Sequence, residues 1–131
     1  MKTRTSILLV DDDSMVRQAL EQALAAENYF VVPAANRDEA LRQLEKHPID
    51  ILLVDLHPWK EDGRETVQRL TALQAHLPVI AMTVRIEEQD PNMDGIEVLL
   101  EKPLNLRILM QALKEFASQK MEPRQEMAPC S

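Results

Sequence analysis

Short apolar runs rich in Ile, Leu and Val alternate along this chain with longer segments whose apolar residues recur every three or four positions. Runs that are apolar at successive positions suit strands covered by helices on both faces, as in parallel sheets. The alternation therefore predicts an α/β fold with a parallel sheet, and five strands are a normal number for one domain. The predicted strands are residues 7–10, 29–32, 51–54, 79–82 and 96–100.

Four of the intervening segments have the periodicity and the end signals of helices. Ser14 is the predicted N-cap of the first, and Asn36, three residues before Glu39, gives the second a start like a capping box. Pro78 ends the third helix, and Asn105 caps the last. The residues predicted to face the core are Val16, Ala19, Leu20, Ala23 and Leu24 in the first helix, Ala40, Leu41 and Leu44 in the second, Val67, Leu70, Leu73 and Ala75 in the third, and Leu106, Leu109, Leu113 and Phe116 in the last.

Composition and length limit the classes of protein to which the chain can belong. Its 131 residues fit one domain, predicted at 1–120, followed by a flexible C-terminal tail at 121–131. The net charge of −7 disfavours binding to nucleic acid phosphates. A single cysteine, Cys130, excludes an internal disulfide and a clustered-cysteine zinc site. No apolar run is long enough to cross a membrane, so we expect a soluble cytoplasmic protein without direct nucleic acid or membrane binding.

Polar side chains stand where the predicted strands end. Asp11 and Asp12 follow the first strand, Asp55 the third, Thr83 the fourth and Lys102 the fifth. In an open parallel sheet, ligands bind at the carboxyl ends of the strands, so we expect these side chains to lie together. Neighbouring carboxylates cost stability unless a cation offsets their charge, and oxygen ligands favour Mg²⁺ over zinc. An aspartate in such a site can be the nucleophile of phosphoryl transfer, with Mg²⁺ and a lysine neutralising the charge that develops.

The motifs at these positions resemble those of the receiver domains of two-component response regulators. They read ILLVDDDSMVR at the first strand, DILLVDL leading to Asp55, DG at 62–63, VIAMT ending at Thr83, and EKP with Lys102. The match covers about residues 5–118. The resemblance implies a flavodoxin-like, doubly wound sheet of five parallel strands in the order 2-1-3-4-5. Residues 83–95 have few apolar side chains for a packed helix, so a short or irregular fourth helix or a loop is expected there.

The same resemblance implies roles for single residues. Asp55 would be the phosphoacceptor, and Thr83 and Lys102 would contact the phosphoryl group; Asp13 is a looser third acid in its run. The implied Mg²⁺ ligands are Asp11, Asp12, Asp55 and the carbonyl group of His57. The phosphoryl donor would be a sensor histidine kinase or a histidine phosphotransfer protein, and a downstream protein would be the target of the signal.

Two departures from the family's pattern fall on its usual output surface. Leu99 stands where the family has a switch aromatic, three residues before the lysine, and residues 83–95 are about one helical turn shorter than usual. The loop after the phosphoacceptor also differs, with His57, Pro58 and Trp59 in place of the usual methionine and proline. We therefore expect phosphorylation to be retained and its readout to be altered.

Three classes of function remain open. The leading one is a phosphoacceptor switch with self-catalysed chemistry, which is not a conventional enzyme. The second is a degenerate receiver that acts as a phosphorylation-independent interaction module; the altered output surface favours it, and the intact set of site residues argues against it. The third is a Mg²⁺-dependent phosphohydrolase with an aspartate nucleophile, but the paired DxD element and the cap domain of such enzymes are missing.

Overall fold

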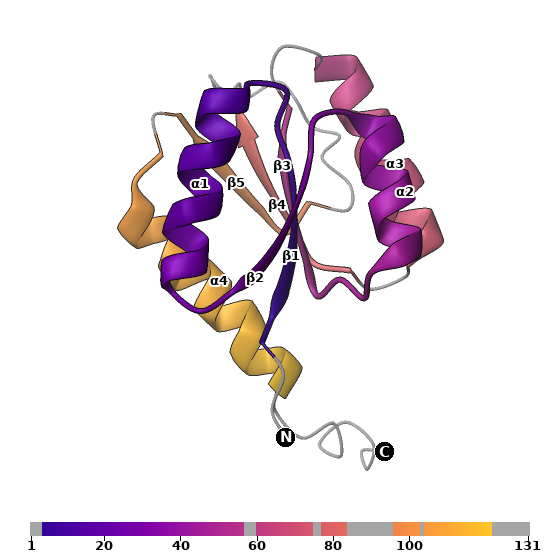
Figure 1. The fold of residues 1–131 in the computed structure, drawn as a ribbon. Helices are drawn as coiled ribbons and strands as arrows, with labels where there is room; N and C mark the ends of the chain where they lie inside the picture. The colour runs from indigo at the N-terminus through magenta and orange to yellow at the C-terminus, as the bar shows by residue number, and fades with distance from the viewer. Residues whose placement is uncertain (1–3, 57–59, 75–76, 84–95, 103, 122–131) are drawn as a thin grey trace.

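The computed structural model of the chain describes residues 4–56, 60–74, 77–83, 96–102 and 104–121. A parallel sheet of five strands in the order β2-β1-β3-β4-β5 forms its centre (Figure 1), which confirms the fold and the strand order expected from the sequence. The strands are β1 (Ser6–Val10), β2 (Phe30–Ala34), β3 (Ile51–Asp55), β4 (Val79–Thr83) and β5 (Val98–Glu101).

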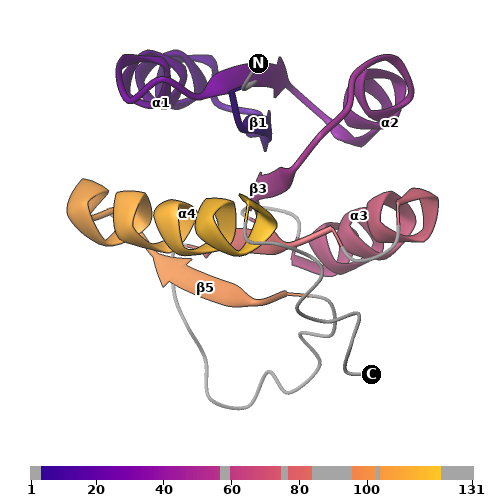
Figure 2. The same cartoon turned by 90° about the horizontal axis from the view of Figure 1, so that it is seen from below.

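Helices cover both faces of this sheet. They are α1 (Ser14–Ala26), α2 (Arg37–Lys46), α3 (Lys60–Leu73) and α4 (Leu106–Met121). Figures 1 and 2 show α1 and α4 on one face and α2 and α3 on the other. The helix labelled α4 is the one that the sequence predicts after Asn105; the short or irregular helix expected in residues 83–95 lies, apart from Thr83, outside the described residues, as does nearly all of the expected tail. No helix in the described ranges is both long and apolar enough to cross a membrane.

Two apolar clusters, one on each face of the sheet, form the core. Alternate residues of β1 and β3 belong to different clusters, because successive side chains of a strand point to opposite faces. Leu8 and Leu52 pack with α2 and α3, whereas Leu9 and Leu53 pack with α1 and α4. All five residues of β1, β3 and β4 are buried, and apart from the terminal Ser6, Asp55 and Thr83 they are apolar at successive positions, as the sequence predicts.

Several local predictions were wrong. The strand predicted at 29–32 is β2, one to two residues further along, and β5 begins at Val98 instead of residue 96. β2 includes Pro33, which lacks an amide hydrogen and is tolerated because β2 is an edge strand. The N-cap of α1 is Asp13, not Ser14: Asp13 has an extended backbone, and its side chain accepts hydrogen bonds from the amides of Met15 and Val16.

Some residues predicted to lie on the buried faces of the helices are exposed. Leu73 is 55 % exposed, because three-residue steps rotate by only about 300° each, so that two of them take Leu73 some 120° away from Val67. Ala19 is also exposed, and Leu106, the first residue of α4, is 45 % exposed. The caps Asn36 and Asn105 are confirmed, since each side chain accepts a hydrogen bond from an amide of the first turn that follows.

Candidate functional site

Three carboxylates converge at the carboxyl edge of the sheet. Asp11 follows β1 and is fully buried, Asp55 ends β3 and is 2 % exposed, and Asp12 is exposed. One oxygen from each of the three lies within 4.8 Å of the others. The prediction that these residues lie together is therefore confirmed, and the pairing of Val10 with Val54 just before the acids shows why: the two strands end at the same level.

A turn of the backbone directs the Asp11 carboxylate. Its Oδ1 accepts a hydrogen bond from the amide of Asp13 at 2.9 Å, and Asp13 in turn caps helix α1. Asp11 Oδ1 is thus engaged by the turn that leads into α1. Among the described residues, the other oxygen, Asp11 Oδ2, is buried without a hydrogen-bond partner.

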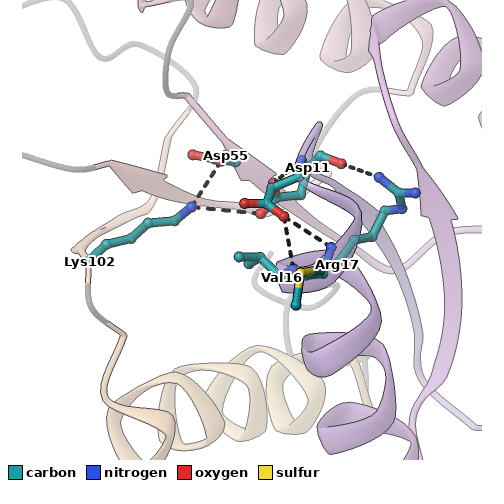
Figure 3. Close-up of polar contacts among 7 residues, drawn as sticks. Asp11, Val16, Arg17, Asp55 and Lys102 are labelled. Atoms are coloured by element: carbon teal, nitrogen blue, oxygen red, sulfur yellow. Dashed lines mark hydrogen bonds and ion pairs between the residues drawn. The ribbon is translucent and has the colours of Figure 1, made fainter.

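Lys102 brings a positive charge to the carboxylates from the far side of the site (Figure 3). Its Nζ lies 3.0 Å from Asp55 Oδ2 and 3.7 Å from Asp11 Oδ2. Its backbone amide donates to the carbonyl of Thr83 at 2.7 Å, which ties the lysine to the end of β4. Burial lowers the pKa of Lys102, but the hydrogen bond to Asp55 and the nearby acids outweigh it, so its pKa lies above the ordinary value.

The pKa of Asp11 is raised to about 6, mainly because burial disfavours the carboxylate. The negative charge of Asp55 raises it further, whereas the amide of Asp13 and the charge of Lys102 oppose the shift. Within the described residues, the ion pairs of Lys102 thus set one ammonium group against two buried carboxylates.

The donor set fits a hard divalent cation such as Mg²⁺. All three potential ligands are carboxylate oxygens, the type that Mg²⁺ prefers, and an exposed Asp12 leaves one side open to water molecules that would complete an octahedron. Asp11 Oδ2 most favours a cation, because this buried oxygen accepts no hydrogen bond from the described residues and its ion pair with Lys102 is 3.7 Å long. Of the other expected site residues, Thr83 is buried at the end of β4, and His57 lies outside the described residues.

A pH dependence follows from the raised pKa of Asp11. Because the folded chain holds this proton more tightly than the unfolded chain, the group's stabilising contribution is complete below about pH 4 and is lost as the pH rises through about 6. For the metal-free chain, we expect Asp11→Asn to raise the free energy of unfolding at pH 7.5 by about 1–3 kcal/mol and to flatten its pH dependence. Urea unfolding in EDTA between pH 4 and 8 measures both. Equal slopes for the two proteins would contradict the expectation.

Sequence reasoning named Asp13 only as a looser third acid, without its capping role, and did not identify Arg17. Asp13 is the cap of α1 and adds negative charge near Lys102. Arg17, one turn into α1, donates from Nη1 to the carbonyl oxygen of Asp11 at 2.7 Å. The sequence shows Arg17 one helical turn after the acidic end of the first strand. Its contact with the Asp11 carbonyl, however, depends on where α1 lies relative to residues 11–13.

Comparisons with known proteins agree with this geometry. A family model described as the response regulator receiver domain matches residues 7–114. The chain is 33% identical over 121 residues to the sensor histidine kinase RcsC of Salmonella typhimurium, a match that covers 90% of this chain and 13% of RcsC. The chain thus spans about an eighth of the length of that relative.

Solved structures show the same fold. A CheY-like receiver domain protein of Methanospirillum hungatei has a TM-score of 0.82 and 26% identity, and the likeness covers 92% of this chain and all of that one. The response regulator TrrA of Thermotoga maritima, solved in complex with Mg²⁺-BeF, has a TM-score of 0.76 and 23% identity over 86% of this chain and 98% of its own. With a family match that spans most of the chain, this protein belongs to the response regulator receiver domains of two-component signalling.

Proposed function

We propose that this receiver domain accepts a phosphoryl group on Asp55, with Mg²⁺, from a histidine kinase or a histidine phosphotransfer protein. The observation that carries the proposal is the position of Asp55 Oδ2, which lies 3.0 Å from Lys102 Nζ within a cluster of three carboxylates. A carboxylate is ionised at neutral pH and needs no base to become a nucleophile. The Mg²⁺-BeF bound to the related fold of TrrA supports a magnesium site of this kind.

Each residue would have a defined task in the transfer. A carboxylate oxygen of Asp55 forms a bond to phosphorus while the phosphorus–nitrogen bond to the donor's imidazole breaks. Lys102 would neutralise charge that builds on the phosphoryl oxygens, and the Thr83 hydroxyl would donate a hydrogen bond to one of them. Asp11, Asp12 and Asp55, with the carbonyl of His57, would hold Mg²⁺, which supplies further charge neutralisation.

The setting of this switch is also a proposal. Because the chain spans only 13% of RcsC, the kinase activity in that protein's name is not carried over to this chain. We propose that the donor is a separate or attached histidine protein in the cytoplasm, and that the target is another protein. A net charge of −7 opposes direct contact with nucleic acid.

A second function, a phosphorylation-independent interaction module, is favoured by one observation. Leu99 of β5 is half-buried against the apolar cluster under α2 and α3, and it pairs with Ala81 of β4. An apolar side chain held in that way has no polar tip with which to switch partners when the site is modified. An altered output surface of this kind is compatible with phosphorylation of Asp55. Leu99 therefore bears on how the domain signals to a partner, and not on whether Asp55 accepts a phosphoryl group.

The test is to incubate the chain with a small-molecule phosphodonor and to follow intact mass. We expect one phosphoryl group to be added in Mg²⁺ and none in EDTA, and peptide mapping to locate it at Asp55. The adduct should be lost at alkaline pH, as an acyl phosphate hydrolyses there. An adduct of equal size in EDTA, or one on another residue, would contradict the proposal, and no adduct even from histidine-phosphorylated donors would favour the interaction module.

A further inference from the structure

The segment 11–13 carries two of the acids proposed to bind the metal, and both backbone polar groups of its first residue, Asp11, are hydrogen-bonded. The amide of Asp11 donates to the carbonyl of Ala34 in β2 at 3.1 Å, and its own carbonyl accepts from Arg17 Nη1 at 2.7 Å. The backbone amide of Arg17 also donates to the carbonyl of Asp13 at 2.9 Å. Arg17 therefore contacts the segment at its beginning, where Figure 3 shows its guanidinium at Asp11, and at its end through its amide.

We propose that Arg17 is a positioning residue for the cation site, because it holds the peptide group that joins Asp11 to Asp12. This inference rests on the proposed Mg²⁺ site. Ala34 holds the amide of the peptide before Asp11 and Arg17 holds the carbonyl of the peptide after it, so the peptide groups on both sides of Asp11 are restricted, and Asp11 Oδ2 is left directed toward Asp55 and Lys102. A hydrogen bond from a charged guanidinium is stronger than one between neutral groups, and here it lies in a half-buried setting that shields it from water.

Electrostatics alone would give Arg17 the opposite effect. A guanidinium close to a cation site repels the cation, so removing its charge would strengthen Mg²⁺ binding if charge were its whole contribution. If Arg17 positions the ligands, removing it weakens Mg²⁺ binding despite the relief of repulsion. The direction of the change therefore separates the two roles.

The experiment compares Mg²⁺ binding to wild type, Arg17→Met and Arg17→Lys by isothermal titration calorimetry. We expect Arg17→Met to weaken Mg²⁺ binding by about 10-fold, the usual scale for losing a group that orients metal ligands. Arg17→Lys, which keeps a donor on a long stem, should lose less. Arg42→Met, which removes an equal charge from an exposed position on α2, should bind Mg²⁺ as wild type does.

Two further readouts keep the test decisive. Urea unfolding in EDTA shows whether each variant folds, and if Arg17→Met does not, Arg17→Lys carries the comparison. At saturating Mg²⁺, the rate at which a phosphodonor modifies Arg17→Met should return to the wild-type rate, because Asp55 and Lys102 are untouched. Unchanged or stronger Mg²⁺ binding in the variant, or a slower rate at saturation, would overturn the role of Arg17. A wild-type chain that binds no Mg²⁺ would overturn the proposed function itself and this inference with it.

Discussion

The variant Asp55→Asn is expected to take up no phosphoryl group from a small-molecule donor in the presence of Mg²⁺. The substitution keeps the size of the side chain but replaces the anionic oxygen, which lies 3.0 Å from Lys102 Nζ, with a neutral amide that is not a nucleophile. We expect the rate of adduct formation to fall by at least about 1000-fold, the scale on which loss of an enzyme's nucleophile acts. Intact mass against time of incubation measures it.

Two control variants show whether the loss is chemical. Asp38→Asn removes an exposed acid from the first turn of α2 and should be modified like wild type. Asp12→Asn removes a proposed metal ligand and keeps the nucleophile, so its rate should recover as Mg²⁺ is raised. Modification of Asp55→Asn at the wild-type rate would show that another residue accepts the phosphoryl group.

The second large effect concerns stability. Leu53→Ala is expected to lower the free energy of unfolding by about 3–5 kcal/mol, because it opens a cavity between the sheet and helices α1 and α4. Leu53 is fully buried and pairs with Leu9 on one side and Ile80 on the other, both also fully buried. These neighbours belong to strands that are themselves covered by helices, so they have little freedom to fill the space.

Leu73→Ala is the matched control for this measurement. It removes the same atoms from a side chain that is 55 % exposed at the end of α3, and surface substitutions usually change stability by no more than about 0.5 kcal/mol. Urea unfolding in EDTA gives both values. Similar losses for the two leucines would show that burial does not determine the cost of the truncation.

Much of the fold was readable in the sequence because its signals are local. The central strands are apolar at successive positions, which is what burial on two faces requires, and helix starts such as Asn36 and Asn105 depend on atoms within one turn. Ser14 failed as a cap because Asp13, its neighbour, offered an acceptor with an extended backbone. Leu73 failed because spacing by threes drifts around a helix.

For the candidate site, the sequence by itself determined the residue types at the strand ends, and parallel strands with those ends must bring Asp11 and Asp55 to one edge. Only the tertiary structure decided their chemistry. The pKa of Asp11 is raised to about 6 mainly because its side chain is fully buried, and Lys102, which pairs with Asp55, stands 47 positions further along the sequence. The contact of Arg17 with the Asp11 carbonyl likewise depends on how α1 packs on the sheet. Burial and charge proximity are sums over residues distant in sequence, so no local pattern encodes them.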